Sequence, residues 1–174
     1  MASSDNTGFC VPYTIRVTPD KGRGVFADVP IRKGTILWRY VRGQYAVYDE
    51  RSLKELLAKL SHSEVVYELM HMFGIPAFPG YIIRVFDDGK LINHSRRPTT
   101  VMNNASGDNE IPYNTSPQDV QDVEDALLND RFAMIATQDL KAGDELTHDY
   151  NIDVEDPSYY DALCEQYDVS WPWL

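Results

Sequence analysis

The segment AGDELTHDYN, from Ala142 to Asn151, places a histidine, a carboxylate, a phenol and an amide in consecutive positions. Such side chains can bind a metal ion, act as an acid/base constellation, or face different environments from an extended strand. On an extended segment His148 and Tyr150 share one face while Asp149 takes the other, which makes shared metal ligation awkward. A face that carries an imidazole and a phenol suits hydrogen bonding to a polar nitrogen or to a sulfur-bearing cofactor.

A second stretch with chemical potential is Lys21-Gly22-Arg23-Gly24. Its two glycines follow a predicted strand, where backbone amides can approach a ligand closely. The third glycine of the dinucleotide-binding fingerprint is missing, and a β-rich segment follows in place of a helix, which disfavours a dinucleotide site. Taken alone, the stretch is more typical of a plain hairpin turn.

The third stretch is LINHS, from Leu91 to Ser95. Taken alone, it is typical of a turn with a hydrogen-bonded core histidine. A metal site would have to combine His94 with His148 and Asp149, and it would need suitably placed ligands and supporting partners around them. The turn is the favoured interpretation of the two.

Length and composition bound the class of protein. The chain has 174 residues, of which 43% are hydrophobic, so we expect one domain spanning residues 1–174 with a real core. No apolar run approaches the ~18 residues of a membrane span, and the N-terminus lacks the features of a secretion signal. Cys10 and Cys164 are the only cysteines, which excludes a disulfide framework and favours a reduced, intracellular compartment.

The net charge of −11 is unevenly distributed. Between Val101 and Asp130 there are seven acidic residues and no lysine or arginine. Such a field repels nucleic acid and attracts cationic partners, although a solvated loop that maintains solubility is the favoured explanation of the acidic run taken alone. We therefore expect an acidic loop over about residues 103–130, with a short helix in its second half, and no direct binding of nucleic acid.

The elements that must position these residues are mostly strands. Alternating or continuous apolar patterns predict strands at Tyr13–Thr18, 24–29, Tyr81–Phe86 and Arg131–Ala136. A helical insert is expected over about residues 50–75. Its first helix is predicted to be capped by Ser52 with Glu55, and its second to run from Ser61 or Ser63 through Phe73.

One spacing occurs twice in the chain. Ala27, Ile31, Gly34 and Leu37 are separated by the same intervals as Ala136, Leu140, Gly143 and Leu146. Each copy is typical of a strand, a polar bend with a glycine and a second strand. Two copies are too few for a solenoid, and they predict two similar corners in a folded sheet.

The order of these motifs, rather than any one of them, is specific. GRG, then a helical insert, then YIIR and LINHS, and finally FAMIATQDLKAGDELTHDYN resemble the SET domain of protein lysine methyltransferases over about residues 13–151. The resemblance implies a β-rich α+β fold of several short sheets, with a helical insert and a threaded, pseudoknot-like C-terminal segment. It further implies transfer of methyl groups from S-adenosylmethionine to lysine side chains.

The resemblance also implies roles for residues at matching positions. Gly22, Arg23 and Gly24 would contact S-adenosylmethionine through their main chain, and Asn93 and His94 would bind the same cofactor. Tyr150 would be the catalytic residue and would also contact the cofactor. Tyr81 and His148 would line the substrate channel for lysine. Glu145 and Asp149 would fix the threaded segment.

Departures from the family pattern limit what is carried over. Arg96 stands where many members have a cysteine, and the tail has only Cys164, so no zinc site is expected. The tail over residues 152–174 is aromatic, and its Trp171 or Trp173 would close the site by packing. His148 occupies a position usually held by phenylalanine or tyrosine, which influences how many methyl groups are added, and Thr99 replaces a common asparagine.

The partner that the resemblance implies is a basic, lysine-containing protein. The acidic loop favours a histone tail, and other lysine-rich proteins fit the same charge. A SET-fold binding module without catalysis is the alternative of a different class, against which the intact motifs argue. The sequence leaves the oligomeric state, the target lysine and a nuclear or cytoplasmic location undecided.

Overall fold

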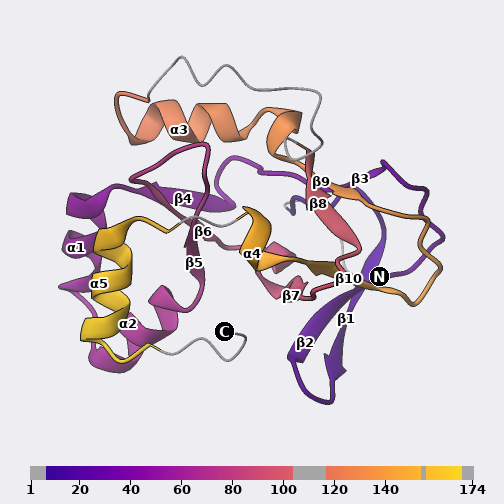
Figure 1. Cartoon of the computed structure of the whole chain (residues 1–174), viewed down its shortest axis with the longest axis horizontal. Coiled ribbons are helices and arrows are strands. Elements are labelled where there is room, and N and C mark those ends of the chain that lie inside the picture. Colours follow the sequence, from indigo (N-terminus) through magenta and orange to yellow (C-terminus); the bar gives the residue numbers. More distant parts are fainter. Residues whose placement is uncertain (1–6, 104–116, 154–155, 170–174) are drawn as a thin grey trace.

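The structure is a computed structural model that describes residues 7–103, 117–153 and 156–169 (Figure 1). The strands are β1 (Tyr13–Thr18), β2 (Gly22–Ala27), β3 (Ile36–Trp38), β4 (Tyr45–Tyr48), β5 (Met72–Gly74), β6 (Ile82–Val85), β7 (Asn93–His94), β8 (Thr100–Met102), β9 (Met134–Ala136) and β10 (Glu145–His148). The helices are α1 (Glu50–Leu57), α2 (His62–Leu69), α3 (Val120–Leu127), α4 (Tyr150–Asp153) and α5 (Ser158–Gln166). Within the described ranges no helix is long and apolar enough to cross a membrane.

Three small sheets form the framework, as a β-rich α+β fold predicts. The strand orders are β1-β2-β10-β7, β3-β9-β8 and β4-β6-β5. Strand β10 pairs antiparallel with β2 on one side and parallel with the short β7 on the other. This parallel pairing brings the LINHS segment beside the AGDELTHDYN segment, although the two are about fifty residues apart in the chain.

Strand β10 is bound along much of its length by the chain that follows β7. The Ser95 amide donates to the carbonyl of His148 at 2.9 Å, and the Thr99 amide donates to that of Thr147 at 3.0 Å. The Thr99 hydroxyl donates to the carbonyl of Glu145 at 2.9 Å and accepts from the Thr147 amide at 2.8 Å. Thr99 therefore holds β10 through its hydroxyl, even though it replaces the asparagine common in the family.

The two predicted corners pack against each other. The Ile31 amide donates to the Leu140 carbonyl at 2.9 Å, and the Leu140 amide donates back to Ile31 at 2.8 Å. Gly34 and Gly143 both have a positive φ. The Gly34 amide donates to the carbonyl of Ala136, and the Gly143 amide donates to the carbonyl of Ala27. The apolar positions of both copies share one core cluster, so the repeated spacing describes two mutually bonded halves of one unit.

The helical insert is confirmed, but its boundaries differ from those predicted. Asp49, rather than Ser52, caps α1: its carboxylate accepts from the Ser52 amide at 2.7 Å, while the Ser52 hydroxyl accepts from the Asp49 amide. The cap of α2 is Ser61, with Glu64 completing the capping box. Helix α2 ends at Leu69, and Phe73 belongs to β5, where it lies opposite Ile83 of β6. Cross-strand pairing thus overrides the helical period at the end of the insert.

Three further predictions need correction or completion. The GRG residues lie within β2 instead of forming the turn before a strand at 24–29. The last strong strand is shorter than Arg131–Ala136, because Asp130–Phe132 forms a 3-10 turn before β9. The expected short helix of the acidic loop is present as α3.

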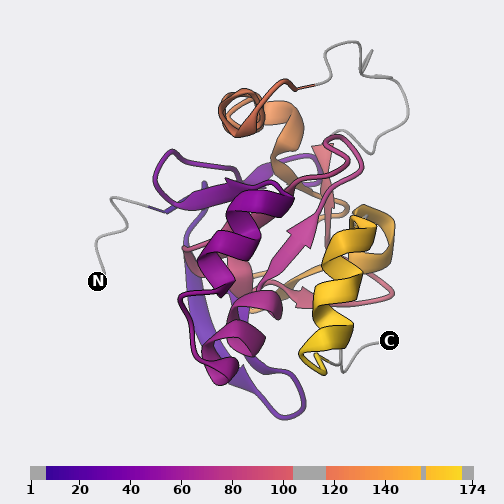
Figure 2. The ribbon, with the colours of Figure 1, turned by 90° about the vertical axis from the view of Figure 1, so that its left-hand side faces the viewer.

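The C-terminal tail contains a helix that the sequence analysis did not foresee. Helix α5 packs on α1 and α2 through an apolar cluster that includes Tyr160, Leu163 and Cys164 (Figures 1 and 2). The buried Tyr160 hydroxyl donates to the carbonyls of Leu69 and Met72, at the junction of α2 and β5. The tail is thereby attached to the insert. Trp171 and Trp173 lie outside the described residues.

Candidate active site

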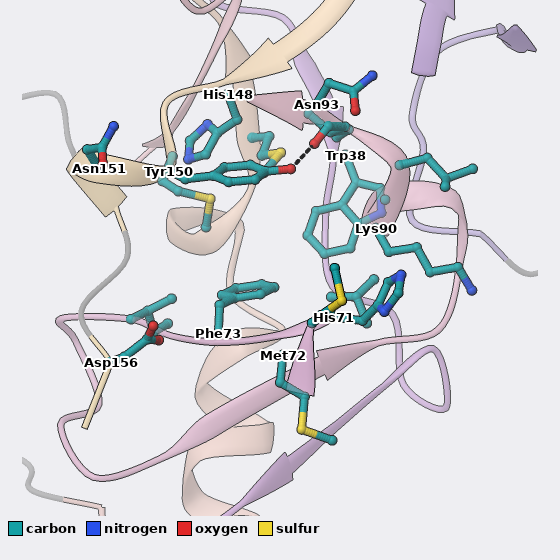
Figure 3. A pocket seen from close by; sticks show the side chains of 18 of the residues that line it. Trp38, His71, Met72, Phe73, Lys90, Asn93, His148, Tyr150, Asn151 and Asp156 are labelled. Atoms are coloured by element: carbon teal, nitrogen blue, oxygen red, sulfur yellow. Dashed lines mark hydrogen bonds between the residues drawn. The ribbon is translucent and has the colours of Figure 1, made fainter. Parts of the chain in front are cut away.

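A cavity of about 680 Å³ lies where β2, β7 and β10 meet the insert and the C-terminal segment (Figure 3). Of the eight residues expected in the site, Arg23, Asn93, His148 and Tyr150 line it. The other lining residues are Lys21, Trp38, Tyr40, Met70, His71, Met72, Phe73, Ile75, Val85, Gly89, Lys90, Leu91, Ile92, Met102, Met134, Asn151, Asp156 and Asp161. Three stretches that are far apart in the sequence, Lys21–Gly24, Leu91–Ser95 and Ala142–Asn151, therefore meet at one cavity.

Tyr150 contributes a partly buried phenol to this cavity from the threaded segment. It begins α4 directly after β10 ends at His148, so the segment quoted first turns from strand to helix at this residue. Its hydroxyl donates to the carbonyl of Ile92 (Figure 3). Burial raises the pKa of Tyr150 to about 12, so the phenol is protonated at neutral pH. A protonated phenol held by a backbone carbonyl can orient a neighbouring group, but it cannot act as a base at neutral pH.

His148 lies beside Tyr150 and lines the same cavity, with the two ring centroids 6.4 Å apart. Its side chain is 4% exposed, and its Nδ1 is 3.2 Å from the hydroxyl of Thr100 on β8. The expectation that these two side chains share one environment agrees with this placement. The reason differs, because Tyr150 belongs to a helical turn and not to a continued strand.

Asp149 takes a different role from its two neighbours. Its carboxylate accepts from the amide of Asn151 at 3.0 Å and from the Asn151 side chain at 3.1 Å, which secures the start of α4. It also lies 3.8 Å from Nδ1 of His94. We infer that Asp149 supports the segment, as the resemblance implied, because its hydrogen bonds stay within its own turn.

His94 touches the site without lining the cavity. Its Nδ1 accepts from the Tyr150 amide at 3.3 Å, and its ring centroid is 5.4 Å from that of Tyr150. His94 and His148 therefore flank Tyr150, one from β7 and the other from β10. No group of three or more potential metal ligands occurs in the described parts of the chain.

Asn93 joins the GRG segment to the threaded segment. Its side-chain amide donates to Oε1 of Glu145 at 2.8 Å and to the carbonyl of Arg23 at 3.2 Å. A Cβ atom built on Gly24 would lie 2.7 Å from Glu145 Oε1 and 2.8 Å from Asn93 Nδ2. Gly24 must therefore lack a side chain for this junction to form. Gly22, at the start of β2, has a φ of +74° and does not line the cavity.

An aromatic ring faces Tyr150 from the other side of the cavity. It belongs to Phe73 of β5, and Figure 3 shows the two rings on opposite sides of the space between them. Tyr81, which was expected to form an aromatic wall, precedes β6 and packs partly buried against a core cluster, and it is not among the lining residues. Tyr81 was assigned from the resemblance, whereas the helical pattern placed Phe73 at the end of a helix and gave no sign of its position in the cavity.

Trp38 and Lys90 lie at the end of the cavity that is remote from Asp156 (Figure 3). The Trp38 indole donates to the buried carboxylate of Asp87 at 3.0 Å. The same carboxylate accepts from the amides of Gly8 at 2.6 Å and Gly89 at 2.9 Å. Asp87 therefore fixes the indole against the chain that leads into β7. No motif in the sequence indicated this position.

Part of the acidic loop is neutralised by arginines. Asp125 pairs with Arg42 at 2.8 Å, and Asp130 pairs with Arg39 at 3.3 Å. Both pairs are exposed, so each contributes little to stability, but they reduce the field that would attract a cationic partner. The acidic residues Asp108 and Glu110 lie outside the described residues, as does most of the loop before α3.

Comparison with known proteins defines the class of this fold and site. A SET domain family model matches residues 22–151, which is more than half of the chain. The chain belongs to the SET domain family. The residues matched include GRG, Asn93, His94 and Tyr150, and they end at the first turn of α4.

Several individual proteins are similar to this chain. The histone-lysine N-methyltransferase ash1 of Drosophila melanogaster is 28% identical over 142 residues, covering 82% of this chain and 5% of its own length. Two solved structures each match over 82% of this chain. The Neurospora SET domain protein DIM-5, a histone lysine methyltransferase, is 19% identical over 53% of its chain, with a TM-score of 0.49. KRYPTONITE in complex with mCHG DNA and SAH is 18% identical over 24% of its chain, with a TM-score of 0.46.

Proposed function

We propose that this chain is an S-adenosylmethionine-dependent protein lysine N-methyltransferase. The observation that carries the proposal is the cavity of a SET domain in which Tyr150 faces Phe73, with Arg23 and Asn93 contributing to the same lining. Membership of the family and the similarity to ash1, a histone-lysine methyltransferase, favour this activity. A basic protein is the proposed substrate, with histones the first choice.

The residues around β2 and β7 fit a cofactor that approaches the backbone closely. A Cβ atom added at Gly22 would meet nothing within 4 Å, so the backbone at the start of β2 is open to a ligand. We assign the main chain of Gly22, Arg23 and Gly24, together with Asn93, to hold S-adenosylmethionine, which supplies an electrophilic methyl group when bound. His94 and Tyr150 adjoin this position through the contact between their rings.

The chain itself must hold and desolvate the amine that reacts. A free lysine amine has a pKa of about 10.4 and is protonated at neutral pH, so it cannot attack a methyl group until it has lost a proton. Enclosure between Phe73 and Tyr150 favours the neutral amine, because burial disfavours the charged form. The protonated Tyr150 hydroxyl orients the neighbouring groups, and positioning of this kind supplies much of a displacement reaction's acceleration.

The test is transfer of a labelled methyl group from S-adenosylmethionine to separated core histones and, in parallel, to ribosomal proteins. We expect labelled lysine, identified by mass spectrometry, in at least one basic fraction. Label on histones would imply work in the nucleus, and label confined to other basic proteins would change the substrate and the location but keep the activity. Binding of S-adenosylhomocysteine without any methyl transfer would instead support a binding module.

A further inference from the structure

The cavity carries opposite charges at its two ends. Lys90 lies on one side and Asp156 on the other, with the Phe73 and Tyr150 rings between them (Figure 3). Arg23 lines the cavity near the end where Asn93 joins β2, so it reinforces the cationic side. Asp161 also lines the cavity and acts electrostatically on Asp156. A ligand with a cationic side chain would therefore be favoured at the Asp156 end.

The carboxylate of Asp156 is fixed in place by the backbone of β5. One oxygen, Oδ1, accepts from the Gly74 amide at 2.7 Å. Because Gly74 directly follows Phe73, this hydrogen bond fixes the carboxylate next to the aromatic ring that faces Tyr150. A fixed carboxylate beside an aromatic face is a favourable arrangement for an ammonium group, which both can attract.

Asp156 also has no cationic partner within the described part of the chain. No lysine or arginine nitrogen there lies within 4.0 Å of its carboxylate. Burial raises the pKa of Asp156 above its usual range, and the neighbouring Asp161 raises it further, while the Gly74 hydrogen bond opposes this. A carboxylate that is partly desolvated and lacks a counterion gains more from an incoming cation than an exposed one does.

We propose that Asp156 is a specificity-determining residue that receives the cationic amine of the substrate lysine at the entrance of the cavity. This inference rests on the proposed function. The lysine arrives as an ammonium ion and is held at Asp156, with Asp161 adding to the attraction. The ammonium then gives up its proton to solvent water, and the side chain advances between Phe73 and Tyr150, where burial favours the neutral amine that can react. Capture and reaction thus take place at two different positions along one path.

The variant Asp156→Asn separates charge from hydrogen bonding. Its side-chain oxygen can still accept from Gly74, so the local structure should survive, and folding is checked by thermal unfolding. We expect the KM for the protein substrate to rise about tenfold, the loss associated with a hydrogen bond to a charged group, while kcat stays within about twofold. Asp161→Asn should produce a smaller rise. Glu165→Gln removes an equal charge from the exposed surface of α5 and should leave the KM unchanged.

A binding measurement tests the inference without turnover. A fluorescent H3(1–15) peptide and a version with norleucine in place of each lysine are titrated against the full chain in the presence of S-adenosylhomocysteine. Norleucine keeps the apolar stem but removes the charged amine. The affinity for the lysine peptide divided by the affinity for the norleucine version should fall about tenfold in Asp156→Asn. The same ratio should not change in Glu165→Gln.

The outcomes separate this inference from the proposed function. Methyl transfer by the wild type, with an unchanged affinity ratio in Asp156→Asn, would overturn the role of Asp156 and leave the function standing. No methyl transfer to any protein, with the ratio still falling, would overturn the function and keep Asp156 as a receptor for lysine. Failure of the wild type to bind the lysine peptide would overturn the inference in either case.

Discussion

The two sides of the cavity are built in different ways. On the side of the motifs, Arg23, Asn93, His148 and Tyr150 come from strands β2, β7 and β10 and the turn that follows β10. Each is held by backbone pairing or by a short hydrogen bond. We call these four residues the motif side. Across from it, Phe73, Asp156 and Asp161 come from β5 and the C-terminal segment, and we call these three the insert side.

The motif side gains its rigidity from a unit that has little to do with the insert. Strand β10 is held between β2 and the chain from β7 to Thr99, and the corner that leads into it is bonded to its counterpart at Ile31. On the insert side, Phe73 is held by the pairing of β5 with β6, while the C-terminal segment that carries Asp156 and Asp161 is attached through the bonds of Asp156 to Gly74 and of Tyr160 to the end of α2. We infer that the motif side fixes the reacting groups and the insert side selects the lysine that enters.

The largest expected effect concerns the motif side. Tyr150→Phe removes one hydroxyl and almost no volume, so the protein should fold and bind S-adenosylhomocysteine with an affinity within a few-fold of the wild type. Because the hydroxyl oxygen orients the reacting groups, we expect kcat to fall by about 10²–10³, the size of effect that follows the loss of one polar group that stabilises a transition state. Single-turnover kinetics with labelled cofactor measure this. A variant that retains most of the wild-type rate would show that the hydroxyl has no catalytic role.

Two other variants give matched controls. Tyr40→Phe removes another buried phenolic hydroxyl from the lining of the same cavity and should leave kcat nearly unchanged. Asn93→Ala should have the opposite effect to Tyr150→Phe, because it should lower the affinity for the cofactor more than kcat. It breaks the link between the Arg23 carbonyl and Glu145, so cofactor affinity measured by calorimetry should fall about tenfold.

The motif side could be predicted from the sequence because each of its motifs consists of neighbouring residues. LINHS and the GDEL-x-x-DY segment are each read from a few neighbouring residues, and the repeated spacing at Ala27 and Ala136 revealed two corners. Their mutual pairing was not predicted, since nothing in the spacing says that the copies bond to each other. Even here the turn to helix at Tyr150 was missed, because a short apolar-polar alternation does not show where a strand ends.

The insert side could not be derived in the same way. Phe73 follows helix α2 with the right helical spacing, and only its pairing with Ile83 in the folded sheet turns it into a strand residue facing the cavity. Asp156 has no motif around it, and its placement depends on α5 packing against α1 and α2. A tertiary contact between distant segments creates both positions, so neither could be predicted from the residues around it.

The next prediction tests whether Phe73 forms the aromatic wall of the cavity. Phe73→Leu keeps the apolar volume but removes the ring that faces Tyr150. The KM for the protein substrate should rise about fivefold, corresponding to about 1 kcal/mol of lost aromatic contact, with kcat and cofactor affinity largely retained. Tyr81→Leu is the matched variant outside the cavity lining and should not change the KM. If Tyr81→Leu had the larger effect, the wall would belong to Tyr81 as the resemblance suggested.

The smallest effect concerns the number of methyl groups that the motif side permits. His148 lies beside Tyr150, with its Nδ1 directed to the Thr100 hydroxyl at 3.2 Å. An imidazole held in this way can hydrogen-bond the substrate amine or a water beside it, and a held water occupies the room that further methyl groups require. We therefore expect mainly mono- and dimethyl-lysine from the wild type and a few-fold shift toward trimethyl-lysine in His148→Phe, measured by mass spectrometry of a methylated peptide.

The control for this last prediction is Thr100→Val, which keeps the imidazole but removes its hydroxyl partner. Because the ring then loses this hydrogen bond, the product distribution should shift in the same direction as in His148→Phe, but by less. A change in His148→Phe alone would mean that the presence of the ring, and not its orientation, limits methylation. Trimethyl-lysine as the dominant wild-type product would contradict the idea, since the held water would then fail to exclude a third methyl group. In that case the room around the amine would have to be set by the insert side, where Phe73 is the nearest candidate.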